Sequence, residues 1–275
     1  MKLLRGIIIG LFVVLAALTG VSEWYARTQV DRTPPTITCE DGVLEVSVQA
    51  DRTELLQGVT AQDDLDGDLT EKVMVEHVSN LTGADTARIT YVVFDSSDNA
   101  ATCSRTIRYT DYRKPRFQLT APLHYYVGDI ITLLDRLTAV DVIDGDLQEK
   151  IRLTASNLTN TLAGTYHVTV QVTNSLGDTS VLPLTILVDS GSGYLTPEIR
   201  LTDYLVYLDA GSRFDPGAYV RSITDPSAGN KNVSKNQAEI FSEVDPSTPG
   251  TYEVVYSYTG SGGREGKTIL TVVVV

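Results

Sequence analysis

The feature that most constrains this chain is an internal repeat. An acidic segment that begins at Asp63, DDLDGDLTEKV, returns about 80 residues later at Asp141 as DVIDGDLQEKI. A strand-like pattern and a polar turn follow both copies, at residues 89–99 and 168–178. A third, weaker copy is marked by a Gly-Thr-Tyr strand that starts at Gly250. Repeats of this period predict successive units of the same supersecondary structure.

Each unit contains six or seven short segments rich in Val, Ile, Thr and Tyr, separated by Gly, Asp, Asn and Pro. Helical periodicity is almost absent. This pattern predicts an all-β fold of three tandem β-sandwich domains, at residues 33–111, 114–189 and 196–275. The glycine-containing linker at 190–193 predicts that the third domain is hinged more loosely than the first two.

Residues 1–30 have the composition of a membrane-targeting segment. Lys2 and Arg5 precede an apolar run at residues 6–21. One interpretation is an uncleaved signal-anchor helix, which gives a single-pass membrane protein with an extracellular C-terminal region. The alternative is a signal peptide cleaved after the small residues at 20–22, which gives a secreted protein.

The overall charge excludes some classes of function. The formal net charge is −13, from 22 basic and 35 acidic residues. Binding to a nucleic acid backbone needs clustered Lys and Arg, so we expect no nucleic acid partner. Three histidines and two cysteines are scant material for a zinc site or a catalytic triad. We therefore expect no enzymatic activity.

The repeated motifs resemble a known family. A Pro-x-Ile opening at Pro35, the Asp-x-x-Asp-Gly-Asp-Leu-Thr loop, the Gly-Thr-Tyr strand and the Asp-Ser-x-x-Asn turn at 95–99 resemble the bacterial Ig-like domain first recognised in pesticidal crystal toxins. The first unit is also similar to the hyalin repeat (HYR), in the segments around Cys39 and Cys103. The third unit departs from the pattern at residues 225–230. The resemblance implies Ig-like sandwiches with an adhesive or spacing role and no activity of their own.

Cys39 and Cys103 are the two cysteines of the chain. An even pair within one domain of an exported protein predicts a disulfide bond, and the HYR resemblance implies the same pairing. Free thiols or an intermolecular bond are the alternatives.

The acidic loops are the candidate metal site. Calcium binds six to eight oxygen atoms, and three carboxylates in a six-residue loop supply part of such a set. The alternative is structural, because Asp side chains cap turns and Gly67 and Gly145 supply a positive φ. No other cofactor is expected. The candidate calcium ligands are Asp63, Asp66 and Asp68 in the first unit and Asp141, Asp144 and Asp146 in the second.

Several tyrosines are further candidates. Tyr166 and Tyr252 lie in Gly-Thr-Tyr strands and are expected to pack, with the hydroxyl bonded to a loop carbonyl as in a tyrosine corner. An exposed aromatic face for sugars or proteins is a second interpretation, although alternation within strands explains the same residues. Its members would be Tyr125, Tyr126, Tyr204 and Tyr207.

Together these features predict a bacterial, non-catalytic cell-surface adhesion or presentation protein. Its partner would be a cell-wall glycan or a surface protein, and its attachment to the membrane would be the N-terminal helix. The alternative is a structural spacer or assembly subunit without a ligand of its own, with rigidification by calcium as an open variant.

Overall fold

The computed structural model describes residues 10–22, 31–191 and 195–275. Residues 10–22 form an exposed helix. Within the described parts of the chain, no helix has both the length and the apolar character needed to cross a bilayer. The ends of the expected membrane-targeting segment, residues 1–9 and 23–30, lie outside the described residues.

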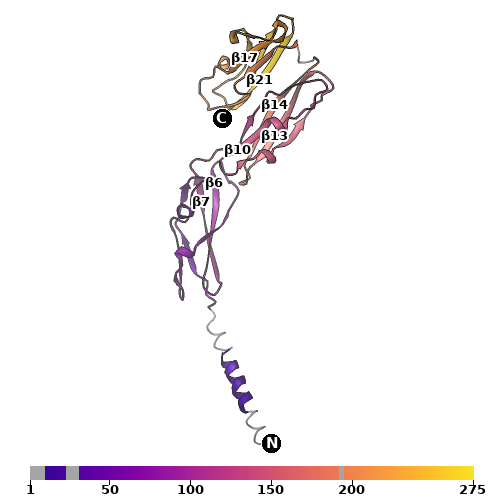
Figure 1. Cartoon of the computed structure of the whole chain (residues 1–275). Coiled ribbons are helices and arrows are strands. Elements are labelled where there is room, and N and C mark those ends of the chain that lie inside the picture. The colour runs from indigo at the N-terminus through magenta and orange to yellow at the C-terminus, as the bar shows by residue number, and fades with distance from the viewer. Residues whose placement is uncertain (1–9, 23–30, 192–194) are drawn as a thin grey trace, which may run out of the picture. The chain divides into compact units, whose positions relative to one another are not determined.

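From residue 31 onward, strands are the main regular secondary structure of the described chain, so the predicted all-β fold class is confirmed. It forms six sheets, arranged as three sandwiches that each pair a three-stranded with a four-stranded sheet (Figure 1). Buried apolar side chains form three separate cores, one in each sandwich. The chain divides into two compact units, Met1–Asp111 and Tyr112–Val275.

In the first domain, the three-stranded sheet has the order β1-β3-β4 and the four-stranded sheet the order β2-β7-β6-β5. All neighbours are antiparallel except β2 and β7, which are parallel. The strands are β1 (Thr36–Cys39), β2 (Val43–Val46), β3 (Val59–Asp63), β4 (Gly67–Asp68), β5 (Met74–Val78), β6 (Thr86–Phe94) and β7 (Ala100–Tyr109), with a short helix α2 (Arg52–Leu55).

The second domain repeats this topology. Its sheets have the orders β11-β10-β8 and β12-β13-β14-β9, and β9 is parallel to β14. The strands are β8 (Arg116–Leu119), β9 (His124–Tyr126), β10 (Leu137–Asp141), β11 (Gly145–Asp146), β12 (Arg152–Ser156), β13 (Gly164–Thr173) and β14 (Thr179–Asp189).

The third domain has the same arrangement, although its sequence is the least similar. Its sheets have the orders β15-β17-β18 and β16-β21-β20-β19, and β16 is parallel to β21. The strands are β15 (Glu198–Leu201), β16 (Leu205–Leu208), β17 (Val220–Asp225), β18 (Lys231–Val233), β19 (Glu239–Ser242), β20 (Gly250–Thr259) and β21 (Glu265–Val274).

Alternation along the strands explains why these sheets form sandwiches. In β6, Ile89, Tyr91 and Val93 point to one face and are fully buried. The Tyr91 hydroxyl donates a hydrogen bond to the carbonyl of Leu55 in α2 (2.6 Å) and accepts one from Arg105 Nε (3.1 Å). A buried tyrosine is therefore accommodated because its polar atom has partners.

The second and third domains pack directly on each other. The Tyr207 hydroxyl accepts a hydrogen bond from the Phe117 amide (3.0 Å), and the Arg116 guanidinium lies 4.8 Å from the Tyr207 ring centre. Leu205 and Val273 of the third domain pack against the core of the second. The expectation of a loosely hinged third domain was therefore wrong, because these two domains share one compact unit.

The tyrosine corners are confirmed in the two domains that carry the Gly-Thr-Tyr motif. Tyr166 donates a hydrogen bond to the carbonyl of Leu162 (2.8 Å), and Tyr252 donates one to the carbonyl of Thr248 (2.9 Å). Each bond returns to a residue four positions upstream, so it fixes the loop that leads into the strand.

The first domain lacks this tyrosine and has a disulfide instead. Cys39 and Cys103 are bonded, with Cα atoms 6.1 Å apart, so the predicted pairing is confirmed. Cys39 lies in β1 and Cys103 in β7, and the bond therefore joins the two sheets of the sandwich.

We expect the Cys103→Ser variant to lose about 4 kcal/mol of stability in the first domain, because the bond closes a loop of 64 residues in the unfolded chain. Calorimetry of the full chain under non-reducing conditions measures this loss. The transitions of the second and third domains serve as the internal control. An unchanged first-domain transition would contradict the stabilising role of the bond.

Candidate functional site

Each three-stranded sheet ends its middle strand in a buried aspartate. Asp63, Asp141 and Asp225 are the last residues of β3, β10 and β17, and their exposed fractions are 4%, 8% and 1%. Asp225 is the equivalent that sequence comparison did not identify as a site residue. Buried carboxylates require hydrogen-bond or ionic partners, so the surroundings of these three decide what each turn can do.

Asp63 and Asp141 hold the same tight turn. Oδ1 of Asp63 accepts hydrogen bonds from the amides two and three residues further on (2.9 and 2.8 Å). Oδ1 of Asp141 accepts the equivalent pair (2.8 and 3.0 Å). Gly67 and Gly145 have φ values of 73° and 71°, as the turn interpretation predicts.

Asp66 and Asp144 connect this turn to the hairpin of the opposite sheet. Asp66 Oδ2 accepts a hydrogen bond from the Ser96 amide (2.6 Å), and Asp144 Oδ2 accepts one from the Ser175 amide (2.7 Å). Asp144 also pairs with Lys150 Nζ (3.0 Å). Burial opposes its ionisation, but the bonds from Ser175 and Lys150 keep the pKa of Asp144 below its usual range.

Asp68 and Asp146 cap the next turn. Each accepts a hydrogen bond from the amide two residues further on (2.9 Å in both cases). The bonds from the side chain and the amide of Thr70 lower the pKa of Asp68. All six of the predicted calcium ligands therefore accept backbone hydrogen bonds. Calcium binding by these two loops stays a prediction.

A second polar position follows the long strand that faces each turn. Asp95, Asn174 and Gly260 come directly after β6, β13 and β20. Asp95 and Asn174 each accept hydrogen bonds from the amides two and four residues further on. Burial opposes the ionisation of Asp95, but hydrogen bonds from the Asn99 side chain and from nearby amides lower its pKa overall.

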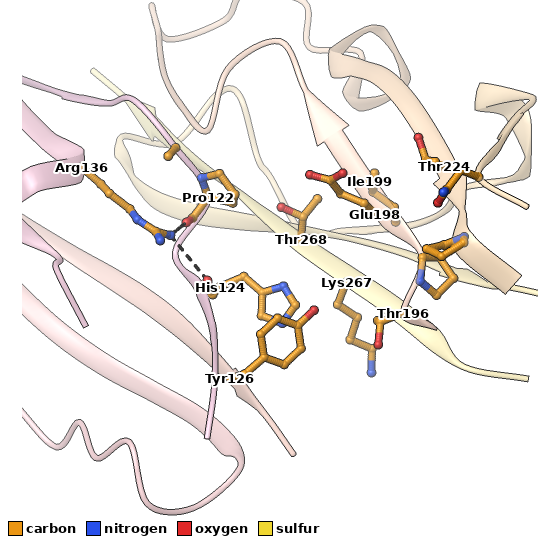
Figure 2. A pocket seen from close by; sticks show the side chains of 14 residues that line it. Pro122, His124, Tyr126, Arg136, Thr196, Glu198, Ile199, Thr224, Lys267 and Thr268 are labelled. Atoms are coloured by element: carbon orange, nitrogen blue, oxygen red, sulfur yellow. Dashed lines mark hydrogen bonds between the residues drawn. The ribbon is translucent and has the colours of Figure 1, made fainter. Parts of the chain in front are cut away.

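A different site lies between the second and third domains. It is a cleft of about 640 Å³, and Figure 2 shows His124, Tyr126 and Arg136 on one side and Glu198, Lys267 and Thr268 on the other. The first three belong to the second domain and the last three to the third. The cleft therefore exists only because these two domains pack together.

The side chains of the cleft are held by bonds within their own domains. His124 Nε2 lies 2.8 Å from Asp189 Oδ2, and the His124 and Tyr126 rings are tilted at 46° with centroids 5.1 Å apart. Arg136 donates to the carbonyls of Pro122 and His124. Burial, together with the nearby Asp189 charge, raises the pKa of Tyr126.

The predicted exposed aromatic face is wrong for most of its members. Tyr125 is 2% exposed and belongs to the core of the second domain. Tyr204 packs against the core of the third domain, and Tyr207 lies in the contact between the two domains. Tyr126 is the member that opens into the cleft.

Comparison with known proteins agrees with this architecture. Residues 30–109 match the HYR domain family.

The first domain is a HYR domain.

The chain is also 37% identical over 134 residues to the pesticidal crystal protein Cry22Aa of Bacillus thuringiensis. That alignment covers 48% of this chain and 18% of the relative's length. Both parts of the family resemblance are thereby confirmed: the chain consists of tandem Ig-like units that begin with a HYR domain.

Solved structures give more distant similarities. The M60 catalytic domain with the CBM51-1 and CBM51-2 domains of Clostridium perfringens ZmpB is 13% identical, with 89% of this chain and 31% of that chain covered and a TM-score of 0.25. The protocadherin GammaB4 extracellular domain is 12% identical, with 89% and 51% covered and a TM-score of 0.23.

The HYR domain holds one group of residues that sequence reasoning did not assemble. Among the described residues, Asp31, Asp63 and Asp95 form the one group of three metal-ligating side chains whose ligand atoms all lie within 4.8 Å of one another. Asp66 and Asp68 are not part of it. The match between the turns at 95–99 and 174–178 identified Asp95 as a repeated turn position, but Asp31 carries no sequence signal of its own.

We expect the stability of the third domain to fall as the pH decreases from about 4 to about 2. Hydrogen bonds from the Ser227 side chain and the Ser261 amide lower the pKa of Asp225 to about 2, whereas an unfolded aspartate has a pKa of about 3.9. A lowered pKa stabilises the fold above the unfolded value, and this contribution is lost as the pH falls through the folded value.

Urea unfolding at several pH values measures this dependence. Asp225→Asn should be less stable at neutral pH and should show a smaller decrease in stability over this range. Asp245 contributes to the pH dependence of stability that is left in this variant, since hydrogen bonds also lower its pKa. An equal slope in Asp225→Asn and the parent chain would contradict this assignment.

Proposed function

We propose that this chain is a non-catalytic, exported adhesion protein that binds a glycan in the cleft between its second and third domains. The cleft itself is the observation that supports the proposal. It combines aromatic rings with charged and hydroxyl side chains from two domains, and its volume of about 640 Å³ accommodates a short oligosaccharide.

The chemistry of the cleft favours a sugar. Pyranose rings have an apolar face that packs on aromatic rings, and Tyr126 and His124 provide such rings. Sugar hydroxyls both donate and accept hydrogen bonds. Glu198 supplies acceptors and Lys267 supplies donors from the opposite side of the cleft (Figure 2).

A binding role also fits the way the charged groups of the cleft are engaged. Arg136 is directed to backbone carbonyls, and Lys267 pairs with Glu265 (2.9 Å). His124 is paired with Asp189. Because these charged side chains are held by partners within the protein, we propose that they shape the cleft and contact the ligand. The HYR and Ig-like repeats are also typical of adhesion proteins. We therefore propose no catalytic step.

We expect Tyr126→Ala to weaken binding to bacterial cell-wall polysaccharide by roughly two- to thirteenfold, because one aromatic contact contributes about 0.5 to 1.5 kcal/mol. Co-sedimentation of the full chain with insoluble polysaccharide measures this change. Phe241→Ala is the matched control, since Phe241 is 62% exposed on β19, away from the residues that line the cleft. Equal binding by Tyr126→Ala and the parent chain would exclude this cleft as the glycan site.

A second candidate function is an assembly subunit or spacer. Strands β12 and β19 are the last strands of their four-stranded sheets and are exposed along their whole length. Unpaired edge strands offer backbone groups to a strand of another chain. Sedimentation velocity separates the two candidates. Self-association that Phe241→Ala abolishes and Tyr126→Ala preserves would favour the assembly role.

We propose that the protein is displayed at the cell surface through residues 1–30, with secretion after cleavage as the alternative. The basic residues Lys2 and Arg5 before the apolar run support this proposal. Retention in the membrane fraction, with an N-terminal sequence that precedes Glu23, is the expected result. A mature protein that begins at Glu23 and is recovered from the medium would support secretion instead.

A further inference from the structure

The converging carboxylates of the HYR domain come from three separate parts of its chain. Asp31 precedes β1, Asp63 ends β3, and Asp95 begins the turn between β6 and β7. Asp63 and Asp95 are 4% and 6% exposed, and Asp31 is partly buried. The fold therefore gathers three potential negative charges in a place that water scarcely reaches, which is strongly unfavourable unless a positive charge or proton donors compensate.

The positions of these side chains are fixed by their own hydrogen bonds. The Asp31 carboxylate accepts a bond from the Thr33 amide (2.9 Å), and the Asp31 carbonyl accepts one from Asn99 Nδ2 (3.1 Å). Asn99 Nδ2 also donates to Asp95 Oδ2 (2.7 Å). Asn99 thus ties the segment before β1 to the β6–β7 turn, and it holds the carboxylate of Asp95 and the backbone of Asp31 in place.

One oxygen of the group is left without a partner. Oδ1 of Asp63 receives two amide hydrogen bonds, but Oδ2 is buried and has no hydrogen-bond donor among the described residues. A buried acceptor in this state is rare in folded proteins. Since Oδ2 belongs to a side chain that is 4% exposed, solvent contact is not available to compensate for the missing bond.

In the other two domains, the equivalent oxygen has a hydrogen-bond donor from the protein. In the second domain, Asn174 Nδ2 donates to Asp141 Oδ2 (3.2 Å). In the third, the Ser261 amide and hydroxyl donate to Asp225 Oδ2 (2.8 and 2.9 Å). The HYR domain has Asp95 in place of Asn174, and an ionised carboxylate has no proton to donate.

We propose that the HYR domain binds one calcium ion through Asp31, Asp63 and Asp95. Calcium coordinates oxygen atoms at about 2.3 to 2.6 Å, so two oxygens on one ion are at most about 5 Å apart. The ligand atoms of Asp31, Asp63 and Asp95 all lie within 4.8 Å of one another. Three carboxylates supply part of the six to eight ligands, and backbone carbonyls or water complete the set. This site is independent of the glycan proposal.

Calcium binding would hold the segment before β1 against the β-sandwich of the HYR domain. Asp31 belongs to the segment that leads into β1, whereas Asp63 and Asp95 belong to the sandwich. An ion shared by all three therefore clamps the entering chain to the end of the HYR domain and stabilises that domain by mass action.

The test is isothermal titration of the full-length protein with calcium chloride after chelator treatment, with native mass spectrometry for the stoichiometry. We expect one high-affinity ion per chain and a rise in the unfolding temperature of the HYR domain alone. The informative variant is Asp95→Asn, which replaces a carboxylate with the amide that the second domain carries. It should remain folded without calcium, bind calcium at least about tenfold more weakly and lose the calcium-dependent rise.

Asp146→Asn is the matched control, because it removes a turn carboxylate of the second domain that lies outside the group. It should bind calcium as the parent chain does. The proposal is overturned if the parent chain binds no calcium, if Asp95→Asn binds calcium with unchanged affinity, or if Asp146→Asn abolishes binding.

Discussion

The structure depends on a buried carboxylate at the same position of each sandwich. Asp63, Asp141 and Asp225 end the middle strand of a three-stranded sheet, where water has little access. One oxygen accepts hydrogen bonds from the turn that follows and thereby fixes its shape. The other oxygen faces the hairpin of the four-stranded sheet, and in the second and third domains its hydrogen-bond partner connects the two layers of the sandwich.

The three domains place different chemical groups beside this second carboxylate oxygen. The second uses the amide of Asn174 and the third uses Ser261. The HYR domain has the carboxylate of Asp95 instead, and it also joins its two sheets by a disulfide bond. In this same domain, Oδ2 of the buried Asp63 has no hydrogen-bond donor among the described residues. In our proposal, the same fold holds a calcium ion in the first copy, whereas hydrogen bonds from Asn174 and Ser261 occupy the equivalent oxygen in the other two.

The repeat and the alternation of apolar residues were enough to predict the all-β sandwiches, the disulfide and the tyrosine corners, because these features follow from local pattern and residue type. The carboxylate group was not predictable in the same way. Asp31 and Asp95 are distant from Asp63 in sequence, and the packing of the two sheets on each other brings Asp63 and Asp95 together. Tyr125 and Tyr126 are adjacent in a strand of three residues, which is too short for the pattern to tell which side chain faces inward.

The packing of the third domain on the second was also outside the reach of sequence reasoning. The glycine content of a linker describes the freedom of the linker itself, whereas the contact between Tyr207 and Phe117 depends on two surfaces that are far apart in the chain. The cleft is lined by residues of both packed domains, so the proposed glycan site is a product of tertiary structure rather than of any motif.

A crystal structure of the full chain grown with calcium, with anomalous data, tests the central claim most directly. The account predicts an anomalous peak bound at about 2.3 to 2.6 Å by Asp31, Asp63 and Asp95, and no peak at Asp141 or Asp225, whose oxygens should bond to Asn174 and Ser261. A protein donor within hydrogen-bond distance of Asp63 Oδ2, with no ion beside it, would contradict the account.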